Sequence, residues 1–321
     1  MKNKPIIIVN GEPNSVFIEI LLKTLKYKKF NSPIILISSL KLLKKNFKKI
    51  NYKKKISILD MKNIKYKNLK NNSFYLINVE LGTNHNFNKI SDQSKVFIER
   101  SFNIGLNLIN NNFSDKLING PISKRNFLDK KYLGITEYIS NKLKTKKFAM
   151  LIYNKELSVC PLTTHLPLKK VPKYITRKNI FEKVNLIKSF FKKYRSINPR
   201  IAVLGLNPHC ESTDAFNEDE KILKPAVKSL SKLGYKISGP HSADTIFLRN
   251  NRKKYDVILG MYHDQVLTPI KTLYEFDAIN MTLGLPFLRI SPDHGPNEKM
   301  LGKNLSNPLS LFRAMEFLDK N

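Results

Sequence analysis

Short isoleucine-rich segments alternate with amphipathic ones along the first 120 residues, and this alternation constrains the fold more than any other feature of the chain. Residues 5–10 (PIIIVN) and 33–38 (PIILIS) are continuous apolar runs, as in strands that are buried on both faces. The segments 16–27 and 40–50 have the spacing of amphipathic helices. This order predicts an α/β domain with a parallel sheet covered by helices on both faces. Further strands are predicted at 57–59, 74–79 and 116–120, and a further helix at 92–110.

The middle of the chain departs from this pattern. Residues 147–153 and 157–162 are two consecutive apolar segments joined by Asn154-Lys155, which predicts a hairpin and some antiparallel sheet. The length of 321 residues fits two α/β lobes or one large domain, and we expect a second lobe here. Alternation then resumes, with helices predicted at 178–194 and 218–233 and strands at 200–207 and 256–261.

The composition narrows the class of protein. No run of about 18 apolar residues is present, and the apolar segment near the N-terminus is too short for a signal peptide. The two cysteines, Cys160 and Cys210, form no CxxC motif and no disulfide framework, as is typical of a reducing compartment. We therefore expect a cytoplasmic protein that has no membrane partner.

The formal net charge of +32 raises the question of nucleic-acid binding, because clustered lysine and arginine neutralise phosphates. Only nine of the 57 basic residues are arginine, however, and the lysines accompany abundant asparagine and isoleucine, as AT-rich codon usage produces. The densest basic runs, 41–55 and 142–147, have the pattern of solvated helix and loop faces, without an RNA- or DNA-binding signature. We expect nucleic acid not to be a physiological partner, and charge-driven binding is kept as an alternative.

Three of the six histidines occupy the same kind of position. His165, His209 and His263 each follow the end of a predicted hydrophobic strand. Ligands of doubly wound sheets bind beyond the carboxyl ends of the strands, so three such histidines can converge on one ion. Three imidazoles leave coordination positions open on a divalent metal, as a catalytic site requires. The alternative is three unrelated loop histidines.

The stretch from Gly260 to Gly295 has the highest density of chemically useful side chains. An apolar run ends in His263-Asp264-Gln265, which predicts a strand that delivers a reactive polar tip into a cleft. A lysine, an asparagine and an arginine follow, each from a different short segment, and then a turn sequence. These residues are Lys271, Asn280, Arg289 and Asp293-His294-Gly295.

Several motifs of this chain, in this order and at these separations, resemble those of the 4-hydroxythreonine-4-phosphate dehydrogenase family of pyridoxal phosphate biosynthesis. The resemblance extends from the opening GEP to the final helix. It implies a two-domain α/β fold like that of isocitrate and isopropylmalate dehydrogenases, with the active site in the interdomain cleft, and a homodimer. We expect one domain at 1–120 with 275–321, on the cofactor side, and a second at 121–274, on the metal and dimer side. The motifs are TTHLPL, GLNPH, SADT, MYHDQ, LGLPFLR and DHG.

The resemblance also implies roles for individual residues. By position, His165, His209 and His263 match the metal ligands of the family, and four further residues match its substrate-binding residues. Asp264 and Asp244 are candidates for catalytic proton handling or for supporting the metal ligands, with an ordinary structural role as the alternative. Lys271 is a candidate for both catalysis and substrate binding. The substrate-binding set is Thr136, Lys271, Asn280 and Arg289, and the cofactor-binding set is Asp293, His294 and Gly295.

The implied reaction is the NAD-linked oxidation and decarboxylation of 4-phosphooxy-L-threonine to 3-amino-2-oxopropyl phosphate. NADP is the alternative cofactor, and the metal is Zn, Co, Mg or Mn. A divalent cation on the substrate hydroxyl eases loss of its proton as hydride leaves, and then polarises the new ketone so that carbon dioxide departs. Lysine and arginine hold carboxylate or phosphate oxygens, arginine with the better fork geometry.

Two departures from the family pattern leave alternatives open. Gly-His-Thr-Glu of the family is Gly134-Ile135-Thr136-Glu137 here, so an apolar side chain replaces an imidazole expected near the substrate phosphate. Beyond DHG, the small-residue cofactor loop appears as PNEKMLGKN and clearly retains only Gly302-Lys303. The first departure favours a relative that acts on another hydroxy acid, and the second favours a metal- or ligand-binding homologue without catalysis.

Overall fold

The computed structural model describes residues 3–53, 55–61, 64–65, 68–82, 89–128, 131–132 and 134–321. The chain divides into two compact units, which we call the terminal unit (Met1–Ile139 with Pro286–Asn321) and the central unit (Ser140–Leu285). The limits expected from the sequence, residues 120 and 274, lie 19 and 11 residues before these boundaries. No helix in the described ranges is long and apolar enough to cross a membrane.

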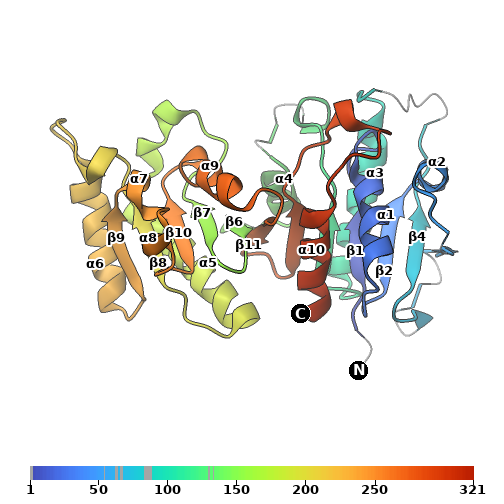
Figure 1. Cartoon of the computed structure of the whole chain (residues 1–321), viewed down its shortest axis with the longest axis horizontal. Helices are drawn as coiled ribbons and strands as arrows, with labels where there is room; N and C mark the ends of the chain where they lie inside the picture. The colour runs from blue at the N-terminus through green and yellow to red at the C-terminus, as the bar shows by residue number, and fades with distance from the viewer. Residues whose placement is uncertain are drawn as a thin grey trace. The chain divides into compact units, whose positions relative to one another are not determined.

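The sheet of the terminal unit is parallel throughout, in the order β3-β4-β2-β1-β5-β12 (Figure 1). Isoleucine-rich β1 and β2 are completely buried, as predicted from their continuous apolar runs. Helices α1 and α10 lie side by side, and α3 packs on β1 and β2. The strands are β1 Ile6–Val9, β2 Ile34–Ser38, β3 Ser57–Ile58, β4 Phe74–Asn78, β5 Lys116–Asn119 and β12 Leu288–Pro292, and the helices are α1 Phe17–Tyr27, α2 Leu40–Ile50, α3 Ser94–Asn110 and α10 Leu309–Lys320, with a π-helix at Lys124–Leu128, α4 at Ile135–Lys142 and a short 3-10 helix at Glu298–Met300.

The central unit has a mixed sheet in the order β11-β6-β7-β10-β8-β9. Strand β6 is antiparallel to both β11 and β7, which confirms the predicted hairpin, and β7, β10, β8 and β9 are parallel. The strands are β6 Ala149–Tyr153, β7 Ser158–Pro161, β8 Ile201–Leu204, β9 Ile237–His241, β10 Val257–Gly260 and β11 Ile279–Leu283, and the helices are α5 Arg177–Arg195, α6 Lys224–Lys232, α7 Ala243–Ile246, α8 Arg249–Arg252 and α9 His263–Tyr274, with a π-helix at Asp219–Leu223 and 3-10 helices at Leu168–Lys170, Pro172–Tyr174 and Pro208–Cys210.

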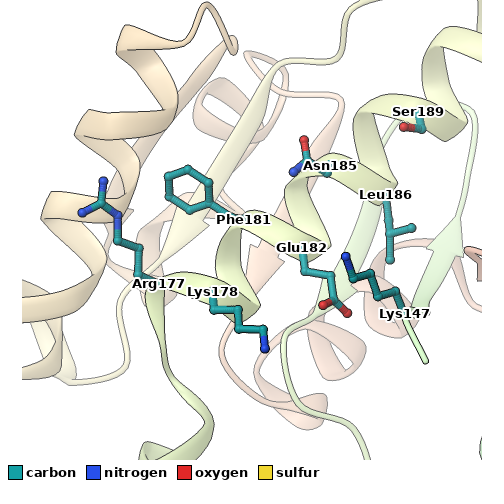
Figure 2. Close-up of a pocket in the computed structure, with 8 residues that line it drawn as sticks. All are labelled: Lys147, Arg177, Lys178, Phe181, Glu182, Asn185, Leu186 and Ser189. Carbon is teal, nitrogen blue, oxygen red and sulfur yellow. The ribbon is translucent and has the colours of Figure 1, made fainter.

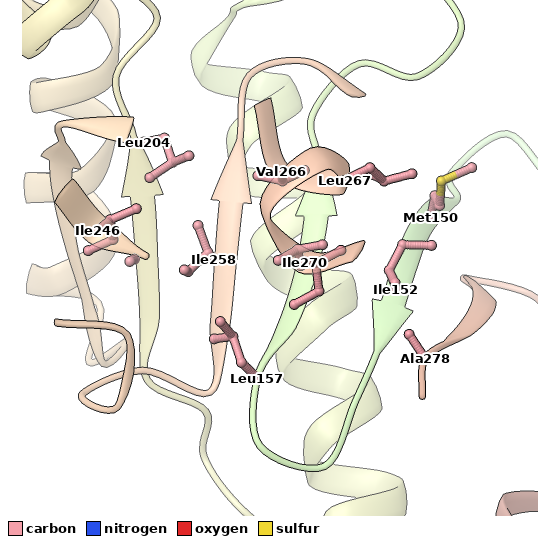
Figure 3. Close-up of a cluster of buried hydrophobic side chains, with 12 residues drawn as sticks. Met150, Ile152, Leu157, Leu204, Ile246, Ile258, Val266, Leu267, Ile270 and Ala278 are labelled. Carbon is pink, nitrogen blue, oxygen red and sulfur yellow. The ribbon is translucent and has the colours of Figure 1, made fainter. Parts of the chain in front are cut away.

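Helix α9 was not among the predicted elements. The polar tip expected after the 256–261 strand forms its first turn, and Pro269 in its interior interrupts the ordinary helical pattern. Val266, Leu267 and Ile270 of α9 are packed into the core cluster over β6, β7, β8 and β10 (Figure 3). This packing fixes the helix on the sheet and therefore fixes the direction in which its first residue, His263, projects.

Strand β9 also was not predicted. Its sequence ISGPH contains Gly239-Pro240, and all five residues are only half-buried. The strand lies at one end of the strand order, where a proline that cannot donate a ladder hydrogen bond is tolerated. The apolar pattern that identifies buried strands is absent from such an edge.

Two glycines bring the end of β1 and the end of β5 into backbone contact. Gly11 has φ +74°, and a Cβ at Gly11 or at Gly120 would collide with the backbone oxygen of the opposite segment. The amide of Glu12 donates to Pro121 O at 2.8 Å, and that of Gly120 donates to Val9 O at 2.8 Å. Only residues without a side chain permit this approach.

Candidate active site

The three strand-end histidines follow three adjacent parallel strands. His165 comes after β7, His263 after β10 and His209 after β8, and β10 pairs with both of the other strands. The carboxyl ends of parallel neighbours meet at one edge of a sheet, so the topology places all three histidines at the same edge.

Hydrogen bonds fasten the segment after β7 to the segment after β10. The amide of Leu162 donates to Gly260 O at 2.7 Å, and the hydroxyl of Thr163 donates to Met261 O at 2.7 Å. The ring centroids of His165 and His263 consequently lie 5.6 Å apart, with an angle of 39° between the ring planes. The structure therefore brings two of the three predicted metal ligands together.

Gln265 fastens the end of β10 to the end of β8. Its Oε1 accepts from the amide of Met261 at 2.7 Å, and its Nε2 donates to Gly205 O at 2.8 Å. The completely buried carboxylate of Asp219 then holds the loop after β8, accepting from the amides of Leu206 and Asn207 at 2.8 and 3.1 Å. Sequence reasoning missed Asp219, and the only signal was an acidic residue at the start of a predicted helix.

His209 has a different environment from the other two histidines. It is the middle residue of the short 3-10 segment Pro208–Cys210 and is exposed there, with left-handed backbone angles of φ 54° and ψ 16°, and Cys210 is also left-handed at φ 63°. Its Nδ1 is 3.4 Å from the hydroxyl of Ser242, which donates to Asp244 Oδ1 at 2.6 Å. The hydrogen bond from Ser242, and then the nearby His209, lower the pKa of Asp244. The arrangement links the predicted residue Asp244 to His209 through one hydroxyl.

Among the described residues, no three histidine, cysteine or acidic side chains gather into a single metal-binding group. The donor chemistry nevertheless fits a divalent transition metal, for which imidazole is a favoured ligand. Asp264 Oδ1 lies 2.7 Å from Nδ1 of His263, so Nε2 is the ring nitrogen that remains for a metal to coordinate. A carboxylate on the second ring nitrogen is the usual support of a metal-bound histidine.

The remaining predicted residues of the central unit lie on α9 and β11. Lys271 is exposed, two turns after His263 on the same helix. Asn280 lies in β11, and its Oδ1 is buried without a hydrogen-bond partner in the part of the chain that the structure describes. A buried amide oxygen of this kind suits a donor on a bound ligand.

In the terminal unit, two predicted substrate-binding residues are in direct contact. Arg289 of β12 is 1% exposed, and its Nη1 donates to Thr136 Oγ1 of α4 at 3.2 Å. Its Nε donates to Asn119 Oδ1 at 2.8 Å, and Asn119 Nδ2 donates to Gly120 O at 2.8 Å, which fixes the orientation of the amide. Asn119 was missed, although it is a polar residue next to the end of the strand predicted at 116–120.

Burial lowers the pKa of Arg289 to about 10, and the nearby Glu137 carboxylate acts in the opposite direction. The guanidinium therefore stays protonated near neutral pH. A cation with fixed hydrogen bonds in a water-poor environment is suited to an oxyanion. Ile135, which replaces the family imidazole, is the first residue of α4 and precedes Thr136 directly.

The predicted cofactor residues follow β12. The amide of Asp293 donates to Ser310 Oγ at 2.9 Å, and His294 Nδ1 lies 2.7 Å from Gly295 O. A Cβ on Gly295 would meet nothing closer than 4.0 Å, so its backbone is open to a ligand. Farther along this loop, Gly302 borders a cavity of about 210 Å³. The open backbone of Gly295 fits the close approach of a dinucleotide.

A second cavity, of about 530 Å³, lies in the central unit along α5 (Figure 2). Its walls combine basic and apolar side chains, among them Arg177, Phe181 and Leu186. None of the predicted site residues lines it, so it is not the candidate active site.

Comparison with known proteins identifies the family. A family model described as the pyridoxal phosphate biosynthetic protein PdxA matches residues 29–318. The chain belongs to the PdxA family. The resemblance read from the motifs is therefore confirmed.

Relatives of the PdxA family match nearly the whole chain. A 4-hydroxythreonine-4-phosphate dehydrogenase from Sulfurihydrogenibium sp. (strain YO3AOP1) is 38% identical over 322 residues, which cover 96% of this chain and 95% of the relative. The crystal structure of a 4-hydroxythreonine-4-phosphate dehydrogenase from Klebsiella pneumoniae has a TM-score of 0.82 at 25% identity and covers 98% of this chain and 97% of that chain. A beta-decarboxylating dehydrogenase from Thermococcus kodakarensis, with a TM-score of 0.51 at 10% identity, covers 97% and 81% and shares the fold. The predicted α/β fold class is confirmed.

Proposed function

We propose that the chain is a 4-hydroxythreonine-4-phosphate dehydrogenase of pyridoxal phosphate biosynthesis, which oxidises and decarboxylates 4-phosphooxy-L-threonine with NAD. The near full-length match to relatives of that name supports the activity. The observation in the structure that carries the proposal is the buried cation Arg289, held by Asn119 and Thr136, because such a group suits an anionic substrate.

We propose that His165, His209 and His263 hold a divalent metal. When bound, that metal supplies the Lewis acid that eases loss of the hydroxyl proton and polarises the resulting ketone. Asp264 fixes the tautomer of His263, and Ser242 with Asp244 orients His209. These carboxylates are therefore assigned to positioning the ligands.

Arg289 binds a carboxylate or phosphate oxygen of the substrate, and Thr136 keeps the guanidinium in place. Lys271 contributes an exposed ammonium group, which is suited to an oxyanion or to proton transfer, and Asn280 Oδ1 accepts from a donor of the substrate. When bound, NAD or NADP would supply the hydride acceptor, and we place it at the turn from Asp293 to Gly295 in the terminal unit, where a Cβ on Gly295 would meet nothing closer than 4.0 Å. The functional protein is a homodimer, which sedimentation at equilibrium tests.

The deciding experiment is absorbance at 340 nm with 4-phosphooxy-L-threonine, NAD or NADP, and each candidate metal in turn. We expect reduction of the cofactor that depends on metal and is abolished by chelation. The unphosphorylated 4-hydroxy-L-threonine serves as the matched control substrate. If no metal and no cofactor support turnover of either compound, the chain is a binding homologue without this activity.

Ile135 supports a second candidate, a family relative that acts on another hydroxy acid. An isoleucine supplies no hydrogen bond where the family has an imidazole, so a phosphate loses one donor. Faster turnover of an unphosphorylated hydroxy acid than of the phosphorylated substrate would favour this candidate.

A further inference from the structure

The 41–55 lysine run, expected to be a solvated face, contributes to a cavity of the terminal unit. This cavity of about 210 Å³ has room for several water molecules, and therefore for a small polar group such as part of a nucleotide. Three segments line it: the turn after β1, helix α2, and the loop that follows DHG. Its lining residues are Pro13, Asn14, Leu42, Lys45, Asn46, Lys49, Glu298, Leu301 and Gly302.

Of the lysines on helix α2, only two line the cavity. Lys45 and Lys49 are one helical turn apart on α2 and therefore lie on one face, whereas Lys44 and Lys48 of the same helix do not line it. Burial, and then the charge of Lys49, lower the pKa of Lys45. Two ammonium groups that repel each other across one cavity wall are stabilised by an anion between them.

Gly302 brings bare backbone to the same place. Its φ is +77°, and a Cβ built on it would lie 2.5 Å from Lys49 Nζ. The ammonium group therefore lies against the Gly302 backbone at a distance that a side chain would prevent. Gly302-Lys303 is also the part of the cofactor loop that this chain clearly retains.

An acidic group lines the cavity beside the two lysines. Glu298 uses Oε1 to accept from the amide of Ile90 at 2.9 Å, which fixes its carboxylate. A carboxylate accepts from sugar hydroxyls, and ammonium groups bind phosphate oxygens. The cavity thus combines the two chemistries that a ribose phosphate presents.

We propose that this cavity binds a ribose-phosphate group of a nucleotide, with Lys45 and Lys49 on the phosphate and Glu298 on a ribose hydroxyl. The inference rests on the proposed dinucleotide-linked function and locates one phosphate of that cofactor. The phosphate has two possible sources, the pyrophosphate common to NAD and NADP or the 2′-phosphate of NADP.

Calorimetric titration of the full chain with adenosine, 5′-AMP, 2′-AMP and inorganic phosphate tests the proposal. We expect the phosphorylated nucleosides to bind at least about tenfold tighter than adenosine, and Lys45→Gln or Lys49→Gln to remove about tenfold of that affinity. Adenosine binding should be unchanged in both variants. Lys44→Gln and Lys48→Gln are the matched controls, since each removes one charge from the same helix away from the cavity.

Gly302→Ala provides a test that changes no charge. Its methyl group meets Lys49, so phosphate-dependent affinity should fall while circular dichroism shows an unchanged fold. Tighter binding of 2′-AMP assigns the site to the 2′-phosphate, and tighter binding of 5′-AMP assigns it to the pyrophosphate. Equal losses in the four lysine variants, or none in Lys45→Gln and Lys49→Gln, overturn the proposal.

The titration and the activity assay test the two proposals independently. Lysine-dependent nucleotide binding without cofactor reduction would leave the ribose-phosphate site standing and refute the proposed dehydrogenase activity. If the cofactor is reduced, and neither its affinity nor the rate changes in Lys45→Gln and Lys49→Gln, the dehydrogenase activity stands and the ribose-phosphate site is refuted.

Discussion

The arginine group of the terminal unit and the histidine edge of the central unit are organised in opposite ways. Arg289 is 1% exposed and lies in strand β12, and its partners Asn119 and Thr136 are buried as well. The histidines lie on segments beyond the strands, where the side chain of His263 is 32% exposed and His209 is exposed to solvent. The first group is held by hydrogen bonds that are buried in the core, and the second is held by hydrogen bonds of partly or fully solvent-exposed side chains.

This difference predicts different consequences of substitution. A buried donor that loses its partner destabilises the folded chain, because no water replaces the lost hydrogen bond. An exposed side chain can be removed with little effect on folding, since water solvates what remains. Substitutions in the arginine group should therefore lower stability as well as substrate binding, and those at the histidine edge should act mainly on metal binding and activity.

The largest expected effect is at the histidine edge. His165→Ala, His209→Ala and His263→Ala should each lower metal affinity by more than about 100-fold, and Asp264→Ala by about 10- to 100-fold. Elemental analysis and competition with a chelating dye measure this, and the melting temperature of the metal-free protein should change little. His241→Ala is the control, because its ring bonds Ser238 and Tyr255 and is no predicted ligand. Full metal occupancy in all three histidine variants would refute the ligand set.

Ile135→His sharpens the comparison because it adds a donor beside the arginine group. A charge-assisted hydrogen bond to phosphate contributes about 1.5 to 3 kcal/mol, or roughly ten- to hundredfold in affinity. The Michaelis constant for 4-phosphooxy-L-threonine should fall by up to that factor, and that for an unphosphorylated hydroxy acid should not. An ordinary micromolar constant in the wild type, with no gain in the variant, would show that this position does not weaken phosphate binding.

Asn119→Leu tests the claim that a buried hydrogen bond holds the arginine group. The variant leaves Nε of Arg289 without this acceptor in a buried site, so urea denaturation should show a loss of about 1 to 3 kcal/mol in the free energy of unfolding. Asn103→Leu makes the same replacement on the exposed face of α3 and should be nearly neutral. A loss in the control as large as that in Asn119→Leu would contradict the assignment.

Glu12→Gln gives the smallest expected effect and a test by pH. Glu12 is buried, its Oε1 accepts from Ser94 at 2.9 Å, and its Oε2 has no partner among the described residues. Burial raises its pKa above 4.5, against the hydrogen bonds from Asn14 and Ser94. A carboxyl group with a raised pKa binds its proton more tightly when folded, so it lowers stability as pH rises from 4.5 through the folded-state pKa.

The variant removes that titration. At neutral pH the wild type should be less stable than Glu12→Gln by about 1 kcal/mol, which is the lower end of the desolvation cost of an unsatisfied buried polar group. In acid the difference should vanish, because the carboxyl group is then protonated. Thermal melts from pH 4 to 8 measure it. A difference that is constant across this range would assign the effect to packing instead of ionisation.

The sequence predicted the elements that are governed by apolar periodicity. Strands β1, β2, β4 and β5 and helix α2 occupy the expected residues within one or two positions, because continuous burial leaves an unbroken apolar run. The hairpin of β6 and β7 was also predicted from two unbroken apolar runs. Strand β9 and helix α9 were not predicted, because proline and polar residues interrupt their apolar patterns.

For the candidate site, the sequence indicated which residues carry chemistry and did not indicate which residues support them. The three histidines were recognisable from their position after strands, but the turn of His209 toward Ser242 depends on left-handed backbone angles that no periodicity encodes. Asn119 accepts a hydrogen bond from Arg289, which lies 170 residues later in the sequence. Asp219 accepts one from the amide of Leu206, which lies 13 residues earlier. Such contacts are formed by tertiary structure, so a linear pattern does not reveal them.

The backbone contact between Gly11 and Gly120 has a consequence for how this region opens to solvent. The amides of Glu12 and Gly120 bond across the same backbone contact, so neither can reach solvent unless the ends of β1 and β5 separate. In hydrogen–deuterium exchange the two amides should share one opening free energy and be protected to the same degree. The turn that carries Glu12 and the strand end that carries Asn119 would then open as a single cooperative unit, with Arg289 released from its acceptor at the same moment.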